Sequence, residues 1–104
     1  MNPRERLGDD QVASWVASHP PWRLHAGHLV REVRTSDYPS AARIVEAQVR
    51  LAEGLNHHPV ITLGYNVVSF ELWTHDRGGL TELDLDYARA LDELLAADFA
   101  HCLI

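Results

Sequence analysis

Apolar residues recur along the chain at two spacings, one typical of helices and the other of strands. Between Asp9 and Pro20 they follow the i, i+3, i+4 pattern of a short amphipathic helix. From Trp22 to Thr35 apolar and polar residues roughly alternate on either side of Ala26-Gly27. This alternation predicts two strands joined by a tight turn.

A second helix and a second pair of strands follow. Ser36-Asp37 is a suitable N-cap, and apolar residues then recur at helical spacing until about Asn56. Pro59 prevents the helix from continuing. The β-rich runs Val60 to Leu63 and Val67 to Trp73 predict two further strands around the turn residues Gly64-Tyr65-Asn66.

The last predicted element is a helix that starts at a capping box and runs to about Ala97. Thr81 and Asp84 have the spacing of that box, with Asp in place of the usual Glu. The element order is therefore α-β-β-α-β-β-α. Two hairpins flanked by helices predict a single α+β domain over residues 1–104, with a four-stranded antiparallel sheet and three helices on one face.

This last helix carries two apolar stripes. Leu83, Tyr87, Leu91 and Leu94 form one, and Leu85, Ala88, Leu95 and Phe99 form the other. A helix that only covers a sheet needs a single stripe. The second stripe predicts self-association through this helix.

Composition narrows the possible partners and the location. The 104 residues carry a net charge of −6 without a basic stripe, which argues against direct nucleic-acid binding. No apolar run reaches the roughly 20 residues that span a bilayer, and the N-terminus lacks the apolar stretch of a signal peptide. Cys102 is the only cysteine and cannot form an intrachain disulfide. These features predict a cytoplasmic protein without a membrane partner.

Candidate chemistry gathers at the ends of the predicted elements, where a rigid scaffold can direct side chains toward one point. Histidine exchanges protons near neutral pH, so imidazoles beside carboxylates indicate acid–base catalysis or a metal site. We rank a metal lower, because the adjacent imidazoles of an extended segment point to opposite sides. The group comprises Glu53, His57, His58, Tyr65, His75 and Asp84.

Simpler structural roles exist for several of these residues and for the other histidines. His57 and His58 could interact with the dipole at a helix C-terminus, and Asp84 could act only as a capping residue. The remaining histidines lie in predicted turns or termini, where we expect them to be solvated. They are His19, His25, His28 and His101.

The motif Glu53-x3-His57-His58-Pro59-x5-Tyr65-x9-His75-x8-Asp84 resembles the signature of the pterin-4a-carbinolamine dehydratases, also called 4a-hydroxytetrahydrobiopterin dehydratases. The similarity extends over nearly the whole chain. It implies a hydro-lyase that removes water from 4a-hydroxytetrahydropterin, giving the quinonoid dihydropterin and so recycling the pterin cofactor of aromatic amino acid hydroxylases. It also implies the same α+β fold, assembly into dimers or tetramers, and a reaction without metal or organic cofactor.

The resemblance also assigns roles to individual residues. His57 and His75 would be the acid–base pair, and His58 would hold the pterin. Asp84 would orient His75 or favour its protonated form. Glu53 lies one helical turn before His57 and would assist the site.

Two positions depart from the family pattern. Ile61 replaces a Trp that is frequent in the family, so an aromatic wall beside the pterin would be absent. Trp73 and Tyr65 are the aromatic side chains that could replace it in substrate binding. Asn56 stands where Asp is frequent. Some family relatives act as transcriptional cofactors or assembly factors, so a non-enzymatic interaction protein is the alternative function.

Overall fold

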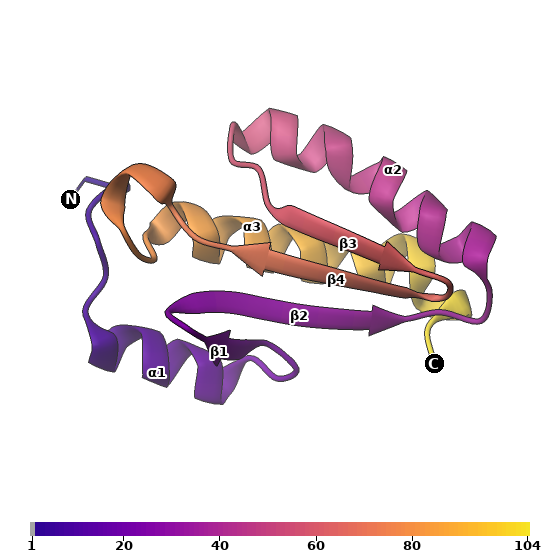
Figure 1. Ribbon diagram of the computed structural model, residues 1–104, viewed down its shortest axis with the longest axis horizontal. Helices are drawn as coiled ribbons and strands as arrows, with labels where there is room; N and C mark the ends of the chain where they lie inside the picture. The colour runs from indigo at the N-terminus through magenta and orange to yellow at the C-terminus, as the bar shows by residue number, and fades with distance from the viewer. Residues whose placement is uncertain (1) are drawn as a thin grey trace.

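The computed structural model describes residues 2–104 and confirms the predicted element order (Figure 1). The helices and strands are α1 (Asp9–Ser18), β1 (Arg23–His25), β2 (His28–Arg34), α2 (Tyr38–Leu55), β3 (Val60–Gly64), β4 (Val67–Leu72) and α3 (Glu82–Leu94). A short 3₁₀ helix, η1 (His75–Arg77), lies between β4 and α3. Within residues 2–104, no helix has both the length and the apolar character needed to cross a membrane.

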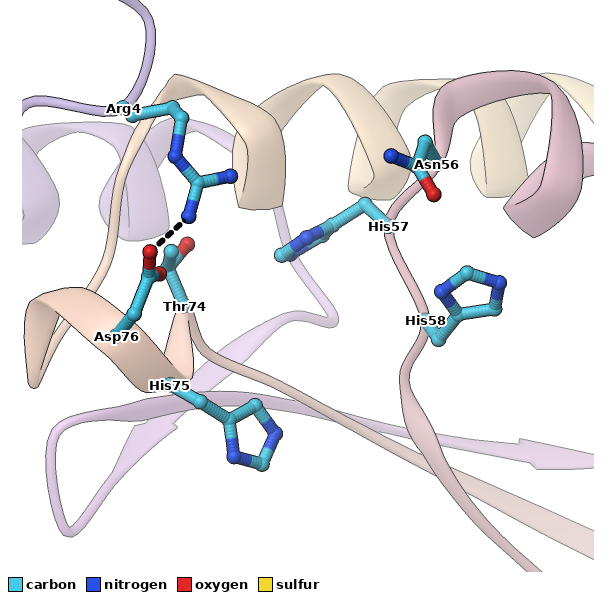
Figure 2. A pocket seen from close by; sticks show the side chains of 7 residues that line it. All are labelled: Arg4, Asn56, His57, His58, Thr74, His75 and Asp76. Atoms are coloured by element: carbon cyan, nitrogen blue, oxygen red, sulfur yellow. Dashed lines mark hydrogen bonds and ion pairs between the residues drawn. The ribbon is translucent and has the colours of Figure 1, made fainter.

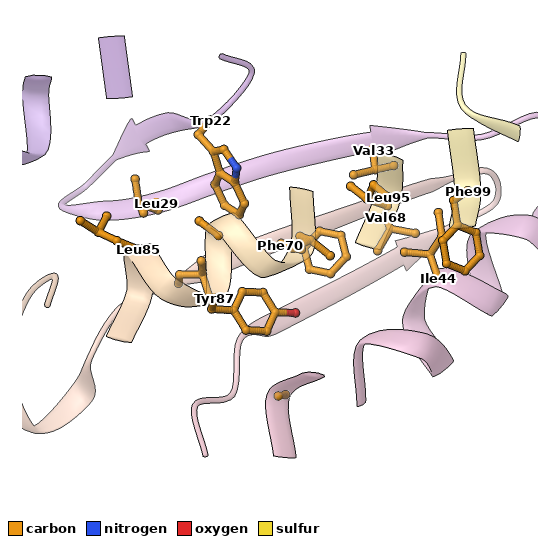
Figure 3. Packing of buried hydrophobic residues seen from close by; sticks show 14 of the residues in the cluster. Trp22, Leu29, Val33, Ile44, Val68, Phe70, Leu85, Tyr87, Leu95 and Phe99 are labelled. Atoms are coloured by element: carbon orange, nitrogen blue, oxygen red, sulfur yellow. The ribbon is translucent and has the colours of Figure 1, made fainter. Parts of the chain in front are cut away.

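The strands form one antiparallel sheet in the order β1-β2-β4-β3, so β4 of the second hairpin, and not β3, lies beside β2. Alternate residues of β4, such as Phe70 and Leu72, are fully buried, whereas Ser69 and Glu71 on the opposite face are half-buried. This period-2 alternation is expected when only one face of a sheet is covered. All three helices contribute to a single hydrophobic cluster with the buried face (Figure 3).

The two ends of α2 are set by their capping residues. At the N-terminus the Asp37 carboxylate accepts a hydrogen bond from the Ser40 amide at 2.9 Å. Hydrogen bonds from Ser40 lower the pKa of Asp37 below its ordinary value. At the C-terminus Asn56 adopts a left-handed conformation (φ 50°, ψ 44°), which Asn tolerates better than most residues. This residue reverses the chain just before His57 and so determines where the histidine points.

Helix α3 begins at the predicted capping box, in which the side chains of Thr81 and Asp84 each accept a hydrogen bond from the backbone amide of the other residue. The α-helix ends at Leu94 rather than at about Ala97, and a π-helical turn, η2 (Leu95–Phe99), continues it. Most residues of the two predicted apolar stripes are buried inside the chain, whereas Leu83 and Leu94 are half-buried. Tyr87, Leu91, Leu85, Ala88, Leu95 and Phe99 are all buried in the core.

The second apolar stripe of α3 therefore does not by itself require another subunit, and self-association through this helix stays a prediction. This helix packs against α2 as well as joining the cluster beneath the sheet. The Tyr87 hydroxyl even donates a hydrogen bond to Gln48 of α2 at 2.7 Å. Burial raises the pKa of Tyr87 far above its ordinary value, so this hydroxyl stays protonated and remains a donor. A helix that packs against both a sheet and another helix needs two apolar stripes, even within a single subunit.

Candidate active site

One open cavity of about 310 Å³ lies where α2, β4 and the N-terminal segment meet (Figure 2). Its three imidazoles come from two segments of the chain. His57 and His58 follow α2, and His75 follows β4 across the sheet end. The other lining residues are Arg4, Asn56, Thr74 and Asp76. The structure thus brings together the three histidines that the sequence singled out.

His57 is held by a buried carboxylate. Its Nε2 lies 2.6 Å from Oδ1 of Asp84, which is completely inaccessible to solvent. The other carboxylate oxygen, Oδ2, accepts from the Thr74 hydroxyl and from the Thr81 amide, each at 2.9 Å. Asp84 therefore pairs with His57 and not with His75, which corrects the sequence-based assignment. Its capping and site roles coexist, because the two oxygens serve different partners.

This pairing determines which nitrogen of His57 can exchange protons. An ionised carboxylate only accepts hydrogen bonds, so the contact requires a proton on Nε2. In the neutral imidazole, Nδ1 then carries the free lone pair. A proton that arrives on Nδ1 creates an imidazolium that Asp84 stabilises. The arrangement suits His57 to the role of a general base.

His58 is held by a second carboxylate, but in a far more open setting. Its Nε2 lies 2.6 Å from Oε2 of Glu53. The two side chains are 55% and 69% exposed. Water screens such a pair, so its contribution to stability is small. The pair can still bias the orientation of the His58 ring at the cavity rim.

His75 differs from the other two histidines, because its ring is oriented by stacking. The Trp73 indole lies against it with 4.2 Å between ring centroids and a 36° interplanar angle. On the same indole, His28 stacks at 4.0 Å and is nearly parallel, at 4°. Nδ1 of His28 in turn lies 2.6 Å from Oε2 of Glu71.

Sequence reasoning missed His28 and Glu71, and it wrongly treated His28 as solvated. The His28 side chain is 27% exposed and has specific partners. His19 was also misjudged, since its ring stacks on Trp15 at 4.0 Å. His25 and His101 are exposed, as predicted.

An ion pair at the cavity was also missed. Arg4 donates a hydrogen bond to the Asp76 carboxylate, and both residues line the cavity. This hydrogen bond is the main reason that the pKa of Asp76 lies below its ordinary value. Their separation of 72 residues explains why no local motif announces the pair.

Tyr65 is not part of this group of residues. It occupies the two-residue turn between β3 and β4, at the end of the hairpin away from the histidines (Figure 1). Its side chain is 72% exposed and its φ is 47°. Within the single chain, Tyr65 therefore has a turn position rather than a cavity position.

In the described part of the chain, residues 2–104, no cluster of three or more His, Cys, Asp or Glu side chains has the arrangement needed to hold a metal ion. The carboxylates near the histidines are instead engaged in pairs. Asp84 binds His57, and Glu53 binds His58.

The sequence of the chain matches a known protein family. The profile of the pterin 4 alpha carbinolamine dehydratase family matches residues 5–94. The chain belongs to this family. A relative from Chloroflexus aurantiacus, provisionally assigned as a pterin-4-alpha-carbinolamine dehydratase, is 41% identical over 86% of the chain and 97% of its own length. One from Streptomyces coelicolor with the same provisional assignment is 38% identical over 95% and 99%.

A solved structure of the family has the same fold. The crystal structure described as a transcriptional coactivator/pterin dehydratase from Brucella melitensis superposes with a TM-score of 0.81 at 27% identity. The alignment covers 86% of this chain and 98% of that one. The α+β architecture predicted from the sequence is thus that of a pterin dehydratase family member.

The two departures from the family pattern have structural explanations in this dehydratase-family chain. Ile61 pairs with Phe70 in the sheet and packs against the hydrophobic core, and it does not line the cavity. In this chain the residue therefore contributes to core packing, and the effect of the Trp replacement on pterin binding stays a prediction. Asn56 does line the cavity, and it is also the left-handed residue that ends α2.

Proposed function

We propose that this protein dehydrates 4a-hydroxytetrahydropterin to the quinonoid dihydropterin. The convergence of His57, His58 and His75 on one cavity carries the proposal. Family membership supports the reaction class. A pure scaffold has no need of three imidazoles around one opening, each held by a specific neighbour.

The reaction requires one proton donor and one proton acceptor. The C4a–O bond breaks as the departing hydroxyl takes a proton and leaves as water. The N5 lone pair forms the C4a=N5 double bond, and the N5 proton passes to a base. Hydroxide is a poor leaving group, so a positioned acid and base contribute typically about 100- to 10,000-fold.

His57 is our candidate for the base that accepts the N5 proton. Its Nε2 is engaged by Asp84, which leaves Nδ1 to take up the proton. The resulting imidazolium is stabilised by a fully buried carboxylate. Thr74 and Thr81 keep that carboxylate in place by donating to its second oxygen.

His75 is our candidate for the acid that protonates the hydroxyl. It faces the cavity from the opposite segment to His57, so the two rings can reach different atoms of one substrate (Figure 2). His58, paired with Glu53, would hold the pterin ring at the rim. Tyr65 has no place in this proposal, because it lies at the far end of the hairpin. Cytoplasmic location and cofactor recycling stay predictions.

A second function is suggested by the name of one solved relative. The Brucella melitensis protein is described as a transcriptional coactivator as well as a pterin dehydratase. Its fold would serve both roles, and a fold alone does not choose between them. An interaction role for the present chain would not depend on its imidazoles, which separates the two hypotheses experimentally.

Adding the purified protein to a hydroxylase reaction and following quinonoid dihydropterin tests the proposal. We expect the wild-type chain to accelerate the step and His57→Ala to lose most of that acceleration. His101→Ala is a matched control, since it removes an exposed imidazole outside the cavity. A wild-type rate equal to the uncatalysed rate would leave the interaction role as the better hypothesis.

A further inference from the structure

His75 is the least supported of the three cavity histidines. His57 and His58 each bond to a carboxylate through Nε2. For the ring of His75, the contacts found within residues 2–104 include no hydrogen bond, and its side chain is exposed. Within the same residues, the aromatic partner found for this ring is Trp73, which lies against it at a tilt. An exposed side chain without a bonding partner samples several rotamers unless packing restricts it.

Trp73 is itself fixed from the neighbouring strand. His28 begins β2, which pairs with β4, and its ring lies parallel to the indole at 4.0 Å. Glu71 precedes Trp73 by two residues and therefore lies on the same face of the sheet. Its carboxylate bonds to Nδ1 of His28 at 2.6 Å. Glu71, His28, Trp73 and His75 thus form a continuous series of contacts that ends at the cavity.

We propose that His28 is a positioning residue for the dehydration: held by Glu71, it fixes the Trp73 indole, and the indole orients the His75 ring at the cavity. The inference rests on the proposed function. His28 does not line the cavity, so it acts through Trp73 and not on the substrate. The Trp73 side chain, which the sequence suggested as a direct substrate contact, becomes the support of the proposed acid.

The chemistry of the contacts explains why a histidine stands at position 28. The His28 imidazole can stack on the Trp73 indole and, through Nδ1, bond to the Glu71 carboxylate at the same time. The two side chains of this pair are only partly exposed, at 27% for His28 and 37% for Glu71, so water does not fully screen the bond between them. Phe at this position would preserve stacking but not the bond to Glu71.

The test compares His28→Ala, His28→Phe and a control, His25→Ala, in the full-length protein. His25 pairs with His28 across the first hairpin and is exposed on its outer strand. We expect His28→Ala to lower kcat about 2- to 10-fold, the range that one aromatic pair supports, with KM changed less. His28→Phe should recover most of the loss, and His25→Ala should behave as wild type.

A second readout does not depend on turnover. In NMR spectra of the histidine rings, the stack on Trp73 should shift the His75 signals by ring current. His28→Ala should move those signals toward the values of an unstacked ring, and His28→Phe should restore them. Glu71→Gln, which retains an acceptor oxygen, provides a variant in case His28→Ala does not fold. We expect it to produce a smaller movement in the same direction.

The outcomes separate the two proposals. An inactive wild-type protein whose His75 signals still respond to His28→Ala would overturn the dehydratase function and retain the positioning contact. An active wild type with unchanged kcat and unchanged His75 signals in His28→Ala would overturn the role of His28. A loss confined to KM would also overturn it, because Trp73 would then contact the substrate directly.

Discussion

Oδ1 of the fully buried Asp84 lies 2.6 Å from Nε2 of His57, which connects the first turn of α3 to the residue that follows the C-cap of α2. The contact joins two segments 27 residues apart. It gives His57 a fixed orientation and a single free ring nitrogen. The Asp84 carboxylate lies where no water can hydrate it, so the hydrogen bonds from His57, Thr74 and Thr81 have to take the place of solvent.

Asp84→Asn should therefore damage both stability and turnover, although the two side chains have the same shape. Asp84 accepts on both oxygens, whereas Asn has one acceptor oxygen and one donor group. The NH2 group of Asn would then face a second donor, either the ring N–H of His57 or the backbone amide of Thr81. Leaving a buried donor unsatisfied costs about 1–3 kcal/mol, which denaturant unfolding would measure.

Asp86→Asn is the matched control for this variant. It lies two residues further along the same helix and its carboxylate bonds to the exposed Arg89. We expect little change in stability or turnover, since surface pairs contribute little. Equal effects of the two substitutions would mean that the contact with His57 has no special importance.

The sequence predicted the elements well, because their signals are local. The turn at Ala26-Gly27 and the capping box at Thr81 both depend on a few adjacent residues. The partner of Asp84, which the family resemblance gave as His75, was assigned wrongly. That choice depends on how α2 and α3 pack, which no local pattern encodes.

The same reason explains the missed support of His75. His28 reaches Trp73 only because β4 lies beside β2 in the sheet order β1-β2-β4-β3. A simple order along the chain would put β3 beside β2 instead. The spacing of apolar residues identifies each strand and the direction of its faces, but it does not identify the neighbouring strand.

Replacing the cavity histidines should separate proton transfer from binding. His57→Ala and His75→Ala each remove a proposed proton-transfer partner, so we expect kcat to fall by about 100-fold or more. His58→Ala should raise KM more than it lowers kcat, because this residue is proposed to hold the ring. Steady-state kinetics on the pterin carbinolamine measures both. Near-normal turnover in His75→Ala would remove it from the acid role.

Removal of metal ions should leave the activity unchanged. In the proposed mechanism protons move between His75, substrate and His57, and no step requires a Lewis acid. Dialysis against a strong chelator followed by the activity measurement tests this directly. Elemental analysis is the necessary companion. Stoichiometric zinc or iron, with activity lost on its removal, would favour the metal alternative that the sequence left open.

The Arg4 hydrogen bond should govern the titration of Asp76. Because the pKa of Asp76 is depressed in the folded protein, the ion pair stabilises the fold at pH values above the ordinary pKa of 3.8. This stabilisation is lost as the pH falls through the depressed pKa. Arg4→Ala should raise the pKa toward 3.8 in a carboxyl NMR titration. Arg77→Ala should move it less, since Arg77 is the weakest of the causes. An unmoved pKa in Arg4→Ala would mean that the pair does not persist in solution.

The apolar stripes of α3 make a final prediction about stability and assembly. Leu95 belongs to the stripe once expected to bind another subunit, yet it is 1% exposed within the single chain. Leu95→Ala should therefore destabilise the fold of each subunit by about 2–5 kcal/mol, because it leaves a cavity in the core. The loss should not depend on protein concentration, as it would if the stripe were an interface. Self-association stays a prediction, tested by light scattering at micromolar concentration. If Leu95→Ala dissociated an oligomer without lowering subunit stability, the interface would lie on α3 after all.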